Sequence, residues 1–191
     1  MATADERAGW RELHRSANEE LRERLVEALD ALVAWTRKDP ALLARRPRSG
    51  AWSGLEVLEH VALSNRFLLV LAGKVRDRSR ARLEAGDPFP TAPPDLEVVA
   101  RSCFDSRPWP APEHMLPTGS IEPDRVRPDL AGQLERCLAF LVEMPSGEGT
   151  LHRIRFSRIS RGDDRLDLYQ WLELIARHAE RHTRQLERAT A

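Results

Sequence analysis

The chain has 191 residues, a length that suits one domain and can bury a sizeable core without disulfide staples. Lysine plus arginine (30) balance aspartate plus glutamate (30), so the basic excess typical of proteins that bind nucleic acids or anionic membranes is missing. The apolar runs are far too short to span a bilayer, and the first residues lack the apolar region of a signal peptide. We therefore expect a single domain, residues 1–191, in the cytoplasm, with no nucleic-acid or membrane partner.

Cysteine usage indicates neither a disulfide framework nor a thiolate metal site. The chain has two cysteines, Cys103 and Cys137, and they do not form a CxxC pair. Cys137 shares a helical stripe with Leu130, Leu134 and Leu141, so we predict that it is a core residue.

The first two predicted helices are amphipathic and have clear ends. Apolar residues recur at helical spacing over residues 5–38, and Pro40 closes this segment. The second helix begins with Ser53 as N-cap, and Glu56, three residues later, can complete a capping box. This register places His60 on the apolar face of a helix that continues to residues 82–84.

A long proline-rich connection follows, over residues 86–127. Ten of the chain's thirteen prolines lie between Gly86 and Pro128, and only residues 96–104 can form a short helix there. Connections of this length are uncommon inside compact domains and usually serve a function.

The last part of the chain is predicted to hold two more long helices. Pro128 suits the first helical position, so we expect a helix over residues 128–144, ended by Pro145. Residues 151–159 alternate in part between apolar and basic side chains, and we interpret them as an extended segment outside any sheet. The last helix starts with Asp167 as N-cap and Gln170 as its capping-box partner, and it runs to about residue 188. Four long amphipathic helices without a convincing strand pair predict an all-α four-helix bundle.

Three histidines lie on the apolar faces of these helices. His178 and His182 are four residues apart in the last helix, where side chains at that spacing are neighbours, and His60 is in the second helix. Burying three imidazoles without partners is costly, so a shared divalent metal ion is the simplest way to satisfy them. Three nitrogen ligands do not select one metal; zinc is the default, and nickel or iron also suits them.

The depths of the histidines predict the order of the bundle. His60 lies about 10 Å inside the start of its helix, and His178 and His182 lie roughly 6–15 Å from the end of theirs. The three reach the same level if these two helices are antiparallel. The second and third helices then run in the same direction, which requires a long crossover such as residues 86–127. We therefore expect an up-down-down-up bundle.

Three other side chains are candidates for supporting roles. Glu56, one turn before His60, could orient its imidazole through a hydrogen bond. Its place in the capping box explains it equally. Arg153 and Arg155 could line the mouth of a pocket and bind an anionic substrate or thiol. A solvated, arginine-rich loop is the alternative interpretation.

These features resemble the DinB-like superfamily of metal-binding four-helix bundles, which includes bacillithiol transferases and mycothiol-dependent maleylpyruvate isomerases. The resemblance rests on residues 51–60, Ala-Trp-Ser-Gly-Leu-Glu-Val-Leu-Glu-His, and on residues 168–186 with both histidines of the last helix. It extends over nearly the whole chain in order and spacing. It implies that His60, His178 and His182 are the metal ligands, that waters complete the coordination sphere, and that homodimers are common. The proline-rich connection is longer and more irregular than the resemblance leads us to expect.

Three neutral imidazoles leave a metal ion its full charge and an open face, which is typical of a catalytic site. The resemblance implies that a metal-held thiolate is transferred to an electrophilic carbon. The leading hypothesis is thus a metal-dependent thiol S-transferase, a detoxifying enzyme that uses a low-molecular-weight thiol and a small-molecule substrate. A metal-held water or thiolate would react, and no side chain is assigned as a general acid or base. Two alternatives stay open: a non-catalytic stress-associated protein that binds a metal or small ligand, and a metal-free bundle.

Overall fold

The computed structural model describes residues 4–48, 50–103, 110–156 and 164–190. Four long helices dominate these ranges: α1 (Ala4–Trp35), α3 (Gly54–Glu84), α5 (Pro123–Glu143) and α6 (Leu168–Thr190). The short elements are α2 (Pro40–Ala44), α4 (Glu97–Cys103), the 3-10 turns η1 (Glu113–Met115) and η2 (Glu148–Thr150), and the strands β1 (Ile154–Arg155) and β2 (Arg165–Leu166). The prediction of an all-α fold with four long helices is confirmed.

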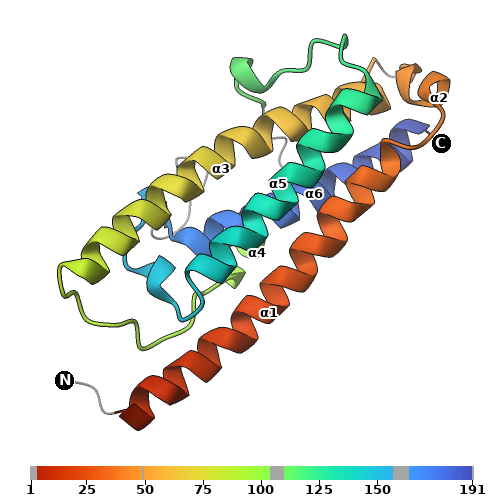
Figure 1. Ribbon diagram of the computed structural model, residues 1–191. Helices are drawn as coiled ribbons and strands as arrows, with labels where there is room; N and C mark the ends of the chain where they lie inside the picture. Colours follow the sequence, from red (N-terminus) through yellow and green to blue (C-terminus); the bar gives the residue numbers. More distant parts are fainter. Residues whose placement is uncertain (1–3, 49, 104–109, 157–163, 191) are drawn as a thin grey trace.

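The four long helices pack around one another so that each contacts two others. Helix α6 packs against α1 and α3, and α5 packs against the same two helices from the other side. In Figure 1, α1 and α6 run toward the end of the bundle at which the C-terminus lies, whereas α3 and α5 run away from it. The start of α3 and the end of α6 therefore lie at the same end of the bundle.

The core consists of apolar side chains from all four long helices. Helix α6 contributes its two largest members, Tyr169 and Trp171, which are fully buried. Cys137 is also fully buried, as predicted, and burial raises the pKa of its thiol to about 12. Each fully buried Leu or Val contributes about 1.5–3 kcal/mol relative to an exposed side chain. Further members of the core are Leu21, Leu25, Leu29, Leu32, Val57, Leu58, Val61, Leu130, Leu172 and Ile175.

Two capping boxes fix where the helices that carry the histidines begin. The hydroxyl of Ser53 accepts the backbone N–H of Glu56, whose carboxylate accepts the backbone N–H of Ser53 at 2.9 Å. Asp167 and Gln170 form the same reciprocal pair at the start of α6, with distances of 3.0 and 3.1 Å. Both predicted starts are confirmed, so the predicted registers of α3 and α6 hold.

The predicted start of the third long helix was wrong. Helix α5 begins at Pro123, with Glu122 as N-cap, and Pro128 lies inside the helix. Proline cannot donate the hydrogen bond that the carbonyl four residues earlier would accept. The helix tolerates this because Val126 and Leu130 on either side are fully buried in the core. The guanidinium of Arg127 also bonds Thr36 beyond the end of α1.

Several short elements were also missed, among them α2 and the strand pair β1 and β2. Asp39 caps the one-turn helix α2 through the backbone N–H of Ala41 at 2.9 Å, so α1 ends at Trp35 and not near residue 38. The segment expected to be extended outside any sheet contains β1, which pairs antiparallel with β2, with Ile154 opposite Leu166. A two-residue strand is too short to show an alternating pattern. The rest of that predicted segment, residues 157–159, lies outside the described residues.

None of the described helices is both long enough and apolar enough to span a membrane.

Candidate metal centre

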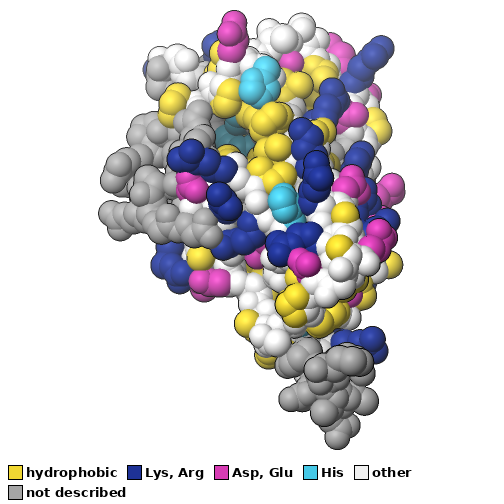
Figure 2. Space-filling model, turned by 90° about the vertical axis from the view of Figure 1, so that its left-hand side faces the viewer, with side chains coloured by type: hydrophobic (Ala, Val, Ile, Leu, Met, Phe, Trp, Pro, Cys, Tyr) yellow, Lys and Arg dark blue, Asp and Glu magenta, His cyan; other side chains and the backbone are white. Residues whose placement is uncertain are grey.

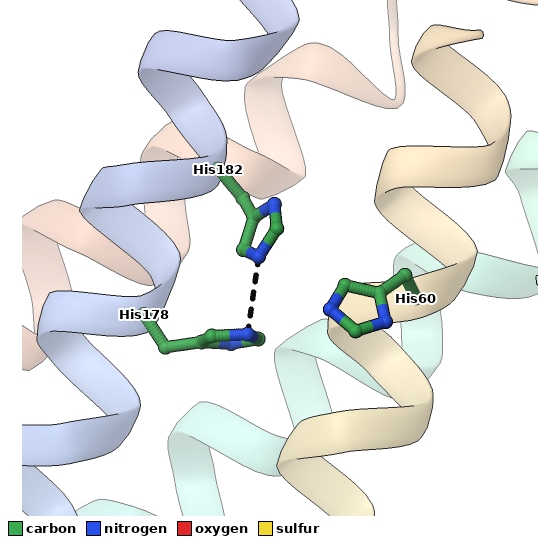
Figure 3. A group of neighbouring side chains, drawn as sticks. All are labelled: His60, His178 and His182. Carbon is green, nitrogen blue, oxygen red and sulfur yellow. Dashed lines mark hydrogen bonds between the residues drawn. The ribbon is translucent and has the colours of Figure 1, made fainter. Parts of the chain in front are cut away.

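His60, His178 and His182 converge between α3 and α6 (Figure 3). The ring centroid of His60 lies 5.4 Å from that of His178 and 4.9 Å from that of His182. The centroids of the two α6 rings are 4.4 Å apart. One nitrogen from each ring lies within 4.8 Å of the others. The structure thus brings together the three histidines that the sequence singled out.

Burial keeps all three imidazoles neutral. The side chains of His60 and His182 are each 6% exposed, and His178 is half-buried. Burial lowers the pKa of His60, and burial together with the other two rings lowers the pKa of His178 well below its usual range. The pKa of His182 falls to about 3, again chiefly through burial. Neutral imidazoles keep a nitrogen lone pair for a metal ion at ordinary pH.

The hydrogen bonds of His60 and His182 determine which nitrogen is free. The Nδ1 atom of His60 lies 2.8 Å from the carbonyl oxygen of Met115, which can only accept, so the ring proton is on Nδ1. The Nδ1 atom of His182 lies 2.8 Å from Oε1 of Gln185, also an acceptor. In both rings the lone pair is therefore on Nε2.

The cluster fits a divalent metal ion. Two nitrogen ligands held at about 2.0–2.1 Å by a tetrahedral zinc ion are roughly 3.3 Å apart. The Nε2 atoms of His178 and His182 are 3.1 Å apart (Figure 3). Nδ1 of His178 is buried and has no hydrogen-bond partner among the described residues, so none of them holds that ring in one tautomer. An ion shared by the three rings would use the Nε2 lone pairs of His60 and His182 and one nitrogen lone pair of His178.

Comparison with known protein families agrees with this geometry. A family model described as the DinB superfamily matches residues 17–186. The chain belongs to the DinB superfamily. Members of this superfamily usually bind a metal ion and include metal-binding enzymes. No curated protein and no solved structure matches the chain.

In this DinB-superfamily protein, Glu56 is engaged away from the histidines. Its carboxylate accepts the backbone N–H of Ser53 in the capping box and pairs with the guanidinium of Arg46. Nδ1 of His60, the atom that the orienting interpretation pairs with Glu56, instead faces the Met115 carbonyl. The structure therefore favours the capping interpretation of Glu56 over the orienting one.

The proline-rich connection contacts the histidine cluster that is the candidate metal centre. Met115, in the 3-10 turn η1, supplies the carbonyl that holds His60, and the next residues are tied to α3. The buried carboxylate of Glu59 accepts the hydroxyl of Thr118 at 2.7 Å and the backbone N–H of Gly119 at 2.9 Å. Gly119 has a φ of 72°, which favours glycine. Sequence reasoning missed Met115 because a backbone acceptor leaves no signal in residue type.

We expect Glu59→Ala to make residues 113–120 of the connection more mobile and to weaken the hydrogen bond from His60 to the Met115 carbonyl. Each lost hydrogen bond to the carboxylate is worth about 1.5–3 kcal/mol. Amide hydrogen exchange over residues 113–120 should accelerate in the variant. Glu143→Ala is the matched control, because Glu143 pairs with Arg76 and Arg80 on α3 and has no hydrogen bond or ion pair to a described residue of the connection. Unchanged exchange in Glu59→Ala would contradict this role of the carboxylate.

Arg153 and Arg155 do not join the histidines. The guanidinium of Arg153 bonds Gln170 at 3.3 Å, and Gln170 precedes His178 by eight residues, about 12 Å along α6. Arg155 is 75% exposed and pairs with Asp164. Arginine and lysine side chains flank a hydrophobic strip on the face shown in Figure 2, so positive charge at one surface position does not by itself mark a binding site.

His14, the histidine of α1, lies apart from the cluster. His14 is buried against Gly147, in the loop after α5, and a Cβ atom added there would lie 2.3 Å from its ring. Burial lowers the pKa of His14, partly offset by the Pro90 carbonyl and the charge of Glu148. His14 therefore fills a packing site between α1 and this loop.

Proposed function

We propose that this DinB-superfamily protein is a metal-dependent enzyme that transfers a low-molecular-weight thiol to an electrophilic small molecule. The observation that carries the proposal is the set of three neutral, buried imidazoles with no carboxylate among them. His60, His178 and His182 would hold the ion, zinc by default and nickel or iron as alternatives. When bound by three neutral ligands, such an ion keeps its charge and can lower the pKa of a coordinating thiol, so that a thiolate forms at neutral pH.

The surrounding residues support this chemistry by shaping the site. Trp52 packs against His60, with ring centroids 4.9 Å apart, and covers one side of the imidazole. As a whole residue, His178 is more exposed than His60 or His182. In the transfer, the thiol sulfur donates an electron pair to the carbon and the leaving group departs with the pair of its former bond. The thiol proton passes to solvent.

The remaining parts of the proposal follow from composition and family. Balanced charge favours a small-molecule substrate over nucleic acid or a membrane surface. A cytoplasmic location suits the use of a reduced thiol. We also propose a homodimer, as is common in the superfamily.

A second candidate is a non-catalytic protein of the stress response that binds a metal or a small ligand. It is favoured by the engagement of two carboxylates in the first turns of α3, since Glu56 caps the helix and Glu59 holds the connection. Neither carboxylate is free to act as a general acid or base. Thiol transfer does not require one, because the ion itself promotes formation of the thiolate.

Two measurements separate these functions. Elemental analysis of protein purified without a nickel column should find about one equivalent of a divalent metal. The loaded protein should then conjugate a thiol, tested with cysteine, glutathione, bacillithiol and mycothiol, to chlorodinitrobenzene faster than free metal does. Metal without conjugation of any of these thiols would favour the binding protein. Protein without metal would exclude the transferase and would leave only the binding of a small ligand.

A further inference from the structure

The two α6 histidines are held differently from each other. Gln185 follows His182 by three residues, a spacing that makes their side chains neighbours on the helix. Its Oε1 atom lies 2.8 Å from Nδ1 of His182. For His178, no described residue bonds Nδ1. A dedicated acceptor therefore serves only one of the two rings that share α6.

His60 has the equivalent contact from a different source. Its Nδ1 atom also lies 2.8 Å from an acceptor, but this is the backbone carbonyl of Met115. Two rings from opposite helices thus present the same nitrogen, Nε2, toward the cluster. The shared pattern indicates that Nδ1 acceptors at this site set the ring tautomer and do not merely fill space, because a wrong tautomer would direct an N–H at the cluster.

We propose that Gln185 is a positioning residue that fixes His182 as an Nε2 metal ligand, an inference that rests on the proposed metal-dependent function. Gln185 does not touch the ion or the substrate; it acts through the ring. Without its acceptor, the proton of the neutral ring is free to move to Nε2, and the ring is free to turn. Outer partners of this kind usually change metal affinity by about 10–100-fold.

The chain offers a matched set of variants on the same helix. Gln185→Leu keeps the size of the side chain and its helix propensity but removes the acceptor. Gln185→Glu restores an acceptor at the same position. Thr183→Val is the control, because the Thr183 hydroxyl bonds the carbonyl of Ala179 within α6 and not a histidine nitrogen.

Zinc affinity, measured by competition with a coloured chelator, is the first test. We expect Gln185→Leu to weaken zinc binding about 10–100-fold, and Gln185→Glu and Thr183→Val to bind zinc at least nearly as well as the original protein. Circular dichroism establishes that each variant keeps its helices. Zinc affinity in Gln185→Leu equal to that of the original protein would overturn the proposal.

A second test separates this proposal from the proposed function. NMR of the histidine ring nitrogens in metal-free protein reports the tautomer directly. We expect the proton on Nδ1 of both His60 and His182 in the original protein, and a change at His182 but not at His60 in Gln185→Leu. If the protein bound no metal, the proposed function would fail, while the His182 tautomer would still decide the role of Gln185. A His182 signal that is the same with and without Gln185 would count against that role.

Discussion

The His178→Ala variant is expected to lose both its bound metal and any conjugating activity. His178 and His182 provide two neighbouring nitrogens 3.1 Å apart, and removing one leaves an incomplete ligand set. The loss of affinity should exceed the roughly 10–100-fold that an outer partner contributes. Elemental analysis after purification without a nickel column, together with the conjugation assay, measures both effects.

A second histidine variant controls for the loss of an imidazole as such. His114 is exposed and packs on Phe67, with ring centroids 5.2 Å apart, and it is not part of the cluster. His114→Ala should keep the metal and the activity. If His178→Ala retained both as well, the three-histidine site would not be the centre of function.

The histidine cluster could be predicted because local rules fix the helices that carry it. The capping box of Ser53 and Glu56 sets the register of α3 from residues that are adjacent in sequence. Asp167 and Gln170 do the same for α6. Once the starts are known, the 3.6-residue period places His60 and His182 on buried faces without knowledge of the tertiary structure.

The missed features depend on contacts between distant parts of the chain. Pro123 and Pro128 are both suitable as first helical residues; the helix begins at the earlier one, and this places Val126 in the core. The Met115 carbonyl reaches His60 across 55 positions of sequence. Gln185 did carry a signal, since an amide three residues after a ligand histidine is within reach of its ring. That signal becomes specific only when the orientation of the ring is known.

Acid is expected to destabilise the metal-free protein through the same histidines. Burial is the main cause that lowers the pKa values of His60, His178 and His182 in the folded state. In the unfolded chain these groups titrate near the ordinary histidine pKa of about 6.5. Above this pH both states are neutral at these positions and the free energy of unfolding is unaffected. Below a pH of about 6.5 these histidines bind protons in the unfolded chain but stay neutral in the folded protein. The free energy of unfolding therefore falls as the pH falls.

The pH range over which stability is lost depends on how far the pKa of each histidine is lowered in the folded protein. The loss begins near pH 6.5 and continues toward the folded pKa, which is about 3 for His182. Each such histidine can remove at most about 1.4 kcal/mol per pH unit, against a total stability of roughly 5–15 kcal/mol for a typical domain. Urea unfolding of chelator-treated protein at pH 7 and pH 5 should therefore show a loss of a few kcal/mol, with a smaller loss in His182→Gln. Equal unfolding free energies at the two pH values would contradict the buried, neutral state of the cluster.

Bound metal should make the free energy of unfolding fall more steeply as the pH is lowered. An ion that binds only the folded protein adds about 4 kcal/mol when its free concentration is a thousand times its dissociation constant. Protons compete for the same Nε2 lone pairs, so this increment disappears as the histidines are protonated. The unfolding curves of loaded and metal-free protein should be well separated at pH 7 and should converge in acid. Convergence would locate the bound ion on the histidines, because carboxylate ligands would hold it to a lower pH.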